Sequence, residues 1–256
     1  MEFEQRKQYI LKQIEENNLV KISNLSKALN VTRETIRKDL YNLEDDGLLK
    51  VVRGGATKIA PNRETEYEKR KKQNVEGKKF IAKKAIKYIH NGDSIYIDYG
   101  TTTYEVARAI QISGFKDLTI VTNAIAVIDL LLRGSTYDII VPGGNVRRSE
   151  ESLSGALTLQ NSETVFVNVG FFGAGGIEKD SGITNHYISE IEVSKKMIQH
   201  SQKSILVVDH TKFGMTALYK TANFEDVDCI ITDKLVDHSI ASAVNLAGTK
   251  LISPQS

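Results

Sequence analysis

From about residue 81 onward, short apolar segments alternate with amphipathic segments, and this alternation constrains the fold more than any other feature of the chain. The apolar segments are rich in Val and Ile on both faces, as strands of a parallel sheet covered by helices must be. The pattern predicts an α/β fold with an open, doubly wound, mostly parallel sheet. The predicted strands cover residues 94–98, 118–122, 137–142, 165–172, 204–209, 229–232 and 250–252. The predicted helices between them cover residues 102–112, 124–132, 189–200 and 239–247.

The chain before this alternation has a different texture. Residues 1–60 contain short helical patterns and end in a strand-like segment with glycines, whereas residues 61–80 are almost wholly polar. A polar, highly charged stretch between two patterned regions is typical of a linker. We therefore expect a small domain over residues 1–60, a charged linker over 61–80 that runs into a helix, and a larger domain over 81–256.

Composition sets a few further limits. The formal net charge of +2 is too mild to indicate a nucleic-acid partner by itself. No apolar run is long enough to span a bilayer, and charges occupy the N-terminal segment where a signal peptide would be hydrophobic. The single cysteine, Cys229, lies in an apolar run and cannot form an internal disulfide. These features predict a cytoplasmic protein that makes no membrane contact.

The N-terminal part contains three helical patterns. The first covers residues 4–16, and a short second helix follows in which Leu25, Ala28 and Leu29 point inward. A tight turn then leads to a third helix over residues 33–44. A short helix, a tight turn and another helix form a helix-turn-helix unit, whose second helix inserts its N-terminal residues into the DNA major groove.

The third helix begins after Thr32, a good N-cap, and ends before Gly47. Residues 48–59 then predict a hairpin wing that turns at its Gly-Gly pair, with Arg53 at the tip. Arginine can pair with guanine edges, whereas lysine and threonine more often contact phosphates. The other interpretation is a plain three-helix bundle with solvated charges. The candidate DNA-binding residues are Thr32, Arg33, Thr35, Arg37, Lys38, Arg53, Gly54 and Gly55.

A Gly-Thr-Thr-Thr turn follows the first predicted strand of the larger domain and opens a helix. Backbone N–H groups, hydroxyl groups and the positive end of the helix would surround one point there, which favours a phosphate. The same residues could serve only as a helix cap. The residues concerned are Asp98 at the end of the strand, then Gly100, Thr101, Thr102 and Thr103.

Small or polar residues follow the other strands at the same edge of the sheet. Open α/β sheets bind ligands at this edge, and such residues leave room for a ligand and supply donors. Lys212 could offer a point charge to a phosphate or carboxylate. The alternative is that the glycines only permit turns and that the lysine is solvated. The segments are Thr122-Asn123, Pro142-Gly143-Gly144, Gly173-Ala174-Gly175-Gly176 and Asp209-His210-Thr211-Lys212.

Both halves of the chain resemble one family. The run from Val31 to Leu40, with Leu43, Gly47 and Arg53-Gly54-Gly55-Ala56, resembles the signature of the DeoR family of bacterial regulators. The family usually has Ser at Thr32 and Arg at Lys38, and both replacements keep the chemistry. The C-terminal half is similar to the DeoR-type sensor domain at the strand ends named above and at Glu151-Ser152 with Gly155, Gly182-Ile183-Thr184, Glu190 and Phe213-Gly214. It departs from the usual sensor pattern at Asn168 and Gly170, where Asp and Ala are more common.

The resemblance implies a repressor whose binding to double-stranded operator DNA is relieved by a phosphorylated sugar. The sensor domain in turn resembles ribose-5-phosphate isomerase and the glucosamine-phosphate deaminases, which hold sugar phosphates. A homodimer or homotetramer is expected, because paired DNA-binding units bind repeated half-sites more tightly than single ones. No cofactor is expected. The candidate effector-binding residues are Asp98, Gly100, Thr101, Thr102, Thr103, Thr122, Asn123, Gly143, Gly144, Glu151, Gly173, Glu190 and Lys212.

Two other functions were weighed against this one. A sugar-phosphate isomerase needs a carboxylate or histidine beside the reacting carbon, and Asp98 could be such a base. The related isomerases place acids after a Gly-Ala pair, but here Gly175-Gly176 follow it. The chain has no nucleotide-binding glycine motif and its histidines are scattered, so neither a nucleotide nor a metal site is predicted. The other possibility is a DNA-binding module joined to a pure dimerisation domain, which would need no pocket.

Overall fold

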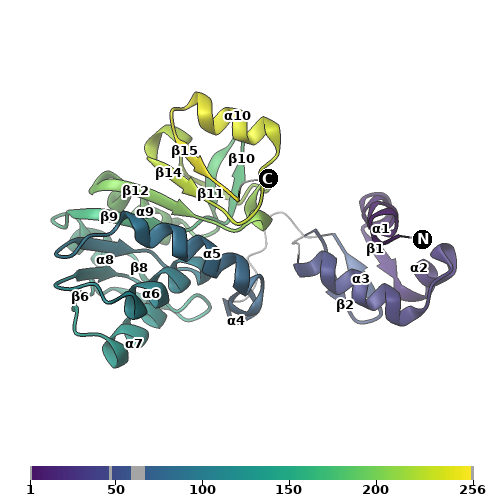
Figure 1. Ribbon diagram of the computed structural model, residues 1–256, viewed down its shortest axis with the longest axis horizontal. Coiled ribbons are helices and arrows are strands. Elements are labelled where there is room, and N and C mark those ends of the chain that lie inside the picture. Colours follow the sequence, from purple (N-terminus) through teal and green to yellow (C-terminus); the bar gives the residue numbers. More distant parts are fainter. Residues whose placement is uncertain (1, 46–47, 59–66, 255–256) are drawn as a thin grey trace. The chain divides into compact units, whose positions relative to one another are not determined.

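The computed structural model describes residues 2–45, 48–58 and 67–254 (Figure 1). The chain divides into two compact units, Met1–Arg63 and Glu64–Ser256. Gly47, where we expected a helix to end, and the expected domain boundary at residues 60 and 61 lie outside the described residues. Each unit has its own hydrophobic core and is considered by itself.

The N-terminal unit is a winged helix-turn-helix, as the sequence predicted. Its described part contains three helices, α1 (Phe3–Asn17), α2 (Ile22–Leu29) and α3 (Arg33–Asp45). It also contains three short strands, β1 (Leu19–Lys21), β2 (Lys50–Val52) and β3 (Gly55–Thr57), in the order β1-β3-β2. Strand β1 was not predicted, because a three-residue strand has no readable periodicity. Ala28, expected to point inward, is exposed.

A buried ion pair ties α1 to α3. The side chain of Asp39 on α3 is 4% exposed and accepts two hydrogen bonds from Arg6 on α1, at 2.6 and 2.9 Å. Two parallel bonds between guanidinium and carboxylate fix orientation as well as distance. This contact therefore sets the direction of α3 against the rest of the small core, which includes Ile36 and Leu40.

The C-terminal unit is built on a parallel sheet. Within residues 67–254 this sheet has seven strands in the order β15-β14-β12-β9-β4-β5-β6, and each adjacent pair is parallel. Six of the seven fall within the segments predicted from the alternation of apolar and amphipathic residues, and β12 overlaps its predicted segment, 204–209, but begins three residues earlier. Their bounds are β4 Ser94–Ile97, β5 Thr119–Thr122, β6 Asp138–Ile140, β9 Val167–Phe172, β12 Ser201–Val207, β14 Cys229–Ile231 and β15 Lys250–Ile252.

Helices cover both faces of this sheet, so the fold is doubly wound as predicted. Buried residues of α5 (Val75–Ala85), α6 (Thr101–Ser113) and α7 (Ile125–Gly134) pack with Ile95, Ile97 and Ile120 on one face. Residues of α9 (Ile188–Gln199) and α10 (His238–Leu246) pack with Tyr96 and Leu206 on the other. Alternate residues along a strand point to opposite faces, which explains this division.

Several short elements in this unit were not predicted. They are the hairpin β7 (Asn145–Arg147) and β8 (Ser152–Ser154), the antiparallel sheet β10 (Gly176–Glu178), β11 (Gly182–Asn185) and β13 (Tyr219–Ala222), and α8 (Ala156–Ser162). Single turns of 3-10 helix lie at Ile86–Tyr88, His210–Lys212 and Phe224–Asp226. Elements this short carry no periodic signal in the sequence. Across the described residues, no helix has the length and apolar character needed to cross a bilayer.

The segment predicted as a charged linker differs from expectation where the structure describes it. Residues 67–80 form helix α4 (Tyr67–Lys72) and the start of α5, and they belong to the C-terminal unit. Tyr67 and Lys78 are buried despite their polar neighbours. The charged residues of this stretch therefore include ones that pack against the sensor fold.

We predict that Asp39→Asn lowers the free energy of unfolding of the N-terminal unit by about 2 kcal/mol, because the partly buried guanidinium of Arg6 loses its charge-assisted hydrogen bonds to a buried carboxylate. Urea unfolding of the full chain, followed by circular dichroism, measures this. Glu16→Gln is the matched control, since Glu16 and Lys12 form an exposed pair at 4.0 Å and should contribute no more than about 0.5 kcal/mol. Equal effects of the two changes would mean that the Arg6 pair does not anchor α3.

Candidate functional site

Helix α3 carries four of the eight candidate DNA-binding residues. Arg33, Arg37 and Lys38 are exposed, and Thr35 is half-buried. Arg37 Nη1 lies 3.0 Å from Glu34 Oε2 in a solvent-exposed pair. Such a pair contributes little to stability, so the guanidinium of Arg37 can exchange this partner for another acceptor at small cost.

Thr32 lies at the start of α3 and caps it, as the sequence predicted. The backbone N–H of Thr35 donates to Thr32 Oγ1 at 3.1 Å, and the two threonine hydroxyl oxygens are 2.8 Å apart. The backbone N–H groups at the start of the helix, together with these hydroxyls, form a donor-rich end.

The two glycines of the wing turn, Gly54 and Gly55, have different roles. Arg53 and Gly54 are exposed, and Gly54 has a φ of +86°, which favours glycine. Gly55 is instead buried in β3, where an added Cβ would lie 1.9 Å from the carbonyl oxygen of Val20. The close approach of β1 to β3 therefore explains why position 55 is a glycine. Gly55 was expected on the exposed DNA-binding surface, but it is buried.

The carboxyl ends of β4 and β9 form the centre of the candidate effector site. The strand order reverses between these neighbours, since β5 and β6 lie on one side and β12, β14 and β15 on the other. Ligands of open α/β sheets bind at such a reversal point. Asp98 follows β4 and Gly173 follows β9, and an added Cβ on Gly173 would lie 3.5 Å from the carbonyl oxygen of Tyr99. The two strand ends are thus side by side.

The Gly-Thr-Thr-Thr turn opens α6 directly after β4. Gly100 has a φ of +127° and its carbonyl oxygen accepts a hydrogen bond from Thr103 Oγ1 at 3.0 Å. Thr101 and Thr103 are buried, whereas Thr102 is partly exposed. The hydroxyl group of Thr103 thus forms a hydrogen bond within the turn. An anion could bind at the N-terminal end of α6, beside Thr102.

Asp98 is buried in a hydrogen-bonded cluster. Its Oδ2 accepts from Ser194 Oγ on α9 at 2.8 Å, and its Oδ1 accepts from Tyr96 OH at 3.2 Å. Burial, the largest cause, raises the pKa of Asp98 to about 7, and the nearby charge of Glu190 adds to the increase. The hydrogen bonds from the two hydroxyl groups oppose the shift but do not cancel it. Asp98 therefore titrates near neutral pH.

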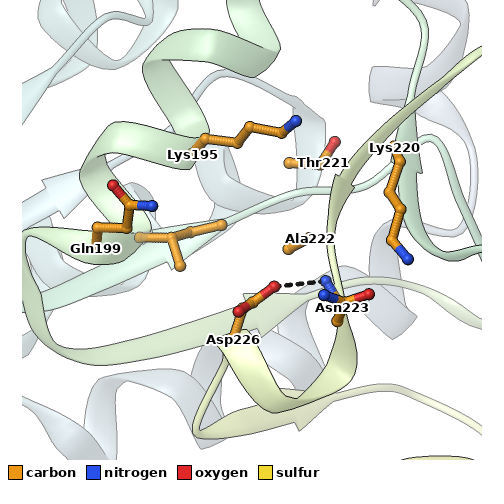
Figure 2. A pocket seen from close by; sticks show the side chains of 8 residues that line it. Lys195, Gln199, Lys220, Thr221, Ala222, Asn223 and Asp226 are labelled. Atoms are coloured by element: carbon orange, nitrogen blue, oxygen red, sulfur yellow. Dashed lines mark hydrogen bonds between the residues drawn. The ribbon is translucent and has the colours of Figure 1, made fainter.

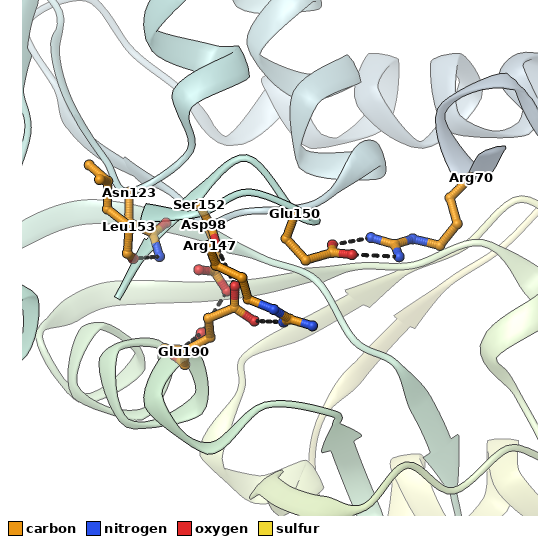
Figure 3. A network of polar contacts seen from close by, with 9 residues as sticks. Arg70, Asp98, Asn123, Arg147, Glu150, Ser152, Leu153 and Glu190 are labelled. Atoms are coloured by element: carbon orange, nitrogen blue, oxygen red, sulfur yellow. Dashed lines mark hydrogen bonds and ion pairs between the residues drawn. The ribbon is translucent and has the colours of Figure 1, made fainter. Parts of the chain in front are cut away.

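Glu190 on α9 is a neighbour of Asp98 in the candidate site (Figure 3). Its side chain is fully buried, accepts a hydrogen bond from Arg147 Nη1 at 2.6 Å and accepts another from Ser152 Oγ. The Arg147 guanidinium also lies over the ring of Tyr187, 4.4 Å from its centroid. The unpredicted β7–β8 hairpin, which carries Arg147 and Ser152, thus supplies the partners of a predicted residue.

Thr122 and Asn123 lie at the end of β5 and are fully buried. Thr122 Oγ1 donates to the carbonyl oxygen of Ile97 at 2.7 Å and accepts from the N–H of Ala124 at 3.1 Å, so it holds the strand ends together. Asn123 Nδ2 donates to the carbonyl oxygen of Leu153 at 3.3 Å, while its buried Oδ1 has no hydrogen-bond partner in the structure. Asn123 therefore supports the β7–β8 hairpin, whereas Thr122 supports the ends of β4 and β5.

Gly143 and Gly144 fit a structural role. Both have positive φ, and an added Cβ on Gly144 would lie 1.9 Å from Thr158 Oγ1. Thr158 Oγ1 also donates to the carbonyl oxygen of Gly143 at 2.7 Å, so α8 docks on this turn. Glu151 lies in the turn between β7 and β8 with a φ of +50°, and its carbonyl oxygen accepts from the N–H of Ile125 at 2.7 Å.

Lys212 lies in the 3-10 turn after β12 and is partly buried. Burial lowers the pKa of Lys78 on α5 to about 8, and the positive charge of Lys212 adds to that decrease. Lys78 was missed from the sequence because it lies in the polar stretch assigned to a linker. Helix α4 ends at Lys72 and α5 begins at Val75, so no continuous helical spacing in the sequence marks Lys78 as buried.

A separate cavity of about 300 Å³ lies between α9 and β13 (Figure 2). Lys195, Gln199, Lys220 and Thr221 are among its lining residues, and none of the candidate effector residues is. It belongs to a different region from the strand ends described above. Among the residues that the structure describes, no group of three or more His, Cys, Asp or Glu could hold a metal ion.

Comparison with known proteins gives matches over nearly the whole chain. The family described as the DeoR-like helix-turn-helix domain matches residues 6–62, and the DeoR C terminal sensor domain matches residues 73–234. The HTH-type transcriptional repressor CsqR of Escherichia coli (strain K12) is 30% identical, covering 98% of this chain and 95% of that protein. The glycerol-3-phosphate regulon repressor of the same strain is 31% identical, covering 90% of each chain.

Solved structures with a similar sheet include ribose 5-phosphate isomerase from Plasmodium falciparum, at 17% identity and a TM-score of 0.39 over 54% of this chain and 52% of that one. The translation initiation factor eIF-2B from Pyrococcus horikoshii OT3 has 14% identity and a TM-score of 0.43, over 61% and 62%. Likeness at this level carries no conclusion about activity or ligand.

We predict that the stability advantage of wild-type protein over Asp98→Asn decreases by about 2 kcal/mol between pH 5 and pH 8. The folded-state pKa of Asp98, about 7, lies above its ordinary value of 3.8. The folded state therefore binds more protons than the unfolded state between these values, and stability falls as the pH rises through this window. Urea unfolding at a series of pH values measures the effect. A difference that does not change with pH would show that Asp98 is ionised throughout.

Proposed function

Because the chain belongs to the DeoR family of transcriptional regulators, we propose that it represses sugar-metabolism genes and leaves its operator when a phosphorylated sugar binds. The observation that carries this proposal is the paired match of a DNA-binding domain and a sensor domain over residues 6–62 and 73–234. The direct test is operator binding, with operator DNA selected from a random-sequence pool, in the presence and absence of sugar and polyol phosphates. A purified, folded protein that selects no DNA sequence would contradict the proposal.

The chain is a regulator and not an enzyme, in line with relatives that are named regulators and repressors. The strand-end geometry is consistent with this assignment. An added Cβ on Gly175 would lie 2.9 Å from His186 Cδ2, and one on Gly176 would lie 2.4 Å from the carbonyl oxygen of Met215. An acidic side chain of the kind that the isomerases carry after their Gly-Ala pair would not fit at Gly176 unless the backbone of Met215 moved, and at Gly175 it would require the ring of His186 to move.

The proposed DNA surface combines α3 with the wing turn. Arg33, Arg37 and Lys38 would enter or border the major groove, while the start of α3 at Thr32 would bind a backbone phosphate. Arg53 at the exposed turn would reach the sugar-phosphate backbone or the minor groove. Gly55 is left out of this surface because it is buried under β1.

The proposed effector binds where β4 and β9 end. Its phosphate would lie at the start of α6 beside Thr102, with Lys212 supplying a positive charge. Its hydroxyl groups would bind the carboxyl groups of Asp98 and Glu151. A relative is named a glycerol-3-phosphate regulon repressor, which favours a polyol or sugar phosphate as the chemical class.

We further propose that the C-terminal units assemble as a homodimer or homotetramer in the cytoplasm, so that two DNA-binding units engage repeated half-sites. Linking two weak binding events raises the apparent affinity without new contacts. The effector must bind the DNA-competent and DNA-incompetent states unequally, because only a difference in affinity can shift their equilibrium.

We predict that Arg37→Ala weakens operator binding by about 1–3 kcal/mol and relaxes base preference at one position, because arginine reads guanine with two hydrogen bonds. Fluorescence anisotropy with operator and random DNA measures both effects. Arg133→Ala is the matched control, since Arg133 is exposed and forms a similar helical pair with Asp129 at 2.8 Å in the C-terminal unit. Equal losses on both DNAs would identify Arg37 as a phosphate contact instead.

We predict that Lys212→Ala weakens effector binding about ten- to a hundredfold while operator affinity stays near the wild-type value, because it removes a charge-assisted contact to phosphate. Thr102→Val should have a smaller effect, since the backbone N–H groups remain. Both variants should act as super-repressors in cells. Lys116→Ala, at the amino end of β5, is the control. Operator release by Lys212→Ala at the wild-type effector concentration would refute this phosphate site.

A further inference from the structure

A buried ion pair joins the start of the C-terminal unit to the tip of the β7–β8 hairpin (Figure 3). Arg70 on α4 donates from Nη1 to Glu150 Oε1 at 2.9 Å, and from Nη2 to Glu150 Oε2. The Glu150 side chain is 1% exposed and that of Arg70 is 14% exposed. The carboxylate of Glu150 thus pairs with two nitrogens of the Arg70 guanidinium. Arginine also binds a phosphate group through this bidentate geometry.

Other cations gather beside Arg70. The buried Lys78 donates from Nζ to the carbonyl oxygens of Arg70 and of Gln73, the latter at 2.7 Å, and so holds the corner between α4 and α5. Burial is the main reason for the lowered pKa of Lys78, and the positive charges of Lys212 and Arg70 contribute to it. Asp209 and Glu105 oppose that shift. Lys78 therefore contacts the backbone of Arg70 at this corner, and the positive charges of Arg70 and Lys212 both act on its ammonium group.

This cluster adjoins the helix end at which we placed the effector phosphate. Lys71, next to Arg70, lies over the ring of Tyr104 on the first turn of α6, 4.8 Å from its centroid. Tyr67 on α4 is buried, and the charge of Glu151 contributes to raising its pKa. Helix α4 is therefore packed between α6 and the β7–β8 turn, the two elements that carry the proposed effector contacts.

We propose that Glu150 is a built-in competitor for the anionic effector: the phosphate takes the place of Glu150 on Arg70, which makes Arg70 an effector-binding residue. This inference rests on the proposed function, and it adds a binding residue and a mode of regulation to that site. Grouped cations repel one another and favour an anion between them. In the absence of effector, Glu150 supplies that negative charge, and a phosphate dianion supplies more of it with the same bidentate geometry.

Glu150, rather than Glu190, is the carboxylate suited to leave. Glu190 lies within helix α9 and is held by Arg147 and Ser152. Glu150 lies in the turn between β7 and β8, next to the exposed Arg148 and Ser149. A turn can move its side chain into solvent without unwinding a helix, so exchange costs less there.

The exchange would also connect the effector site to the chain that leads to the DNA-binding unit. Helix α4 is the first element described after that connecting segment, and Arg70 is its contact with the hairpin. Glu150 is part of the chain and is always present, whereas a bound phosphate can dissociate. If phosphate replaces Glu150 on Arg70, the attachment of α4 to the rest of the unit depends on effector concentration. An equilibrium of this kind is what the effector must bias in order to regulate DNA binding.

The test compares binding of inorganic phosphate, ribose 5-phosphate and glycerol 3-phosphate by isothermal titration calorimetry at one pH and salt concentration. Glu150→Gln should bind phosphate compounds about tenfold more tightly than wild type, because no carboxylate has to be displaced. Arg70→Gln and the double variant Arg70→Gln/Glu150→Gln should both bind about ten- to a hundredfold more weakly. Glu76→Gln removes the same charge from an exposed site on α5 and should match wild type.

A measurement on the wild-type chain covers the case in which Glu150→Gln does not fold. Phosphate should increase hydrogen–deuterium exchange in the turn at residues 148–151 and decrease it at the start of α6. Protection of that turn, equal or weaker binding by folded Glu150→Gln, or full binding by Arg70→Gln would overturn the competition and leave the proposed effector class intact. Failure of wild type to bind any of the phosphates would overturn both.

Discussion

The structure of the larger unit depends on a sheet whose two faces are both covered. Because helices and a small antiparallel sheet seal those faces, side chains such as Ile97 and Tyr96 have no access to water. Polar groups carried by the strands can then meet a ligand only where the strands end. This explains why Asp98 and Lys212, which follow β4 and β12, lie at one edge of the sheet, where we propose that the effector binds.

Much of this architecture could be predicted from the sequence, and the failures have a common cause. The seven parallel strands were found because each contains a short run that is apolar on both faces, and α6, α7, α9 and α10 were found from their amphipathic pattern. The helix-turn-helix was found from its caps and apolar stripe, with Ala28 as the exception. Short strands such as β1 and β8 were missed because their stability comes from partners distant in the chain.

The candidate site was predicted less completely, for an electrostatic reason. Asp98 could be proposed because it follows a strand, and Glu190 because of the family resemblance, but their partners could not be proposed. Arg70, Lys78 and Arg147 lie in polar stretches where charge usually means solvent exposure. Their burial follows from pairing with carboxylates or carbonyl groups, as the cost of desolvating a lone charge requires. Pairing of this kind forms only in the folded chain, so it produces no periodic pattern in the sequence.

The burial of Lys78 and Arg70 has a practical consequence for dividing the protein into parts. A fragment that began at residue 81, where the alternating pattern starts, would lack both cations. Glu150 would then be left in the interior without its counter-charge, and the corner held by Lys78 would be missing. The smallest independently stable sensor fragment should therefore begin before Tyr67, within the stretch predicted as a charged linker that runs into a helix.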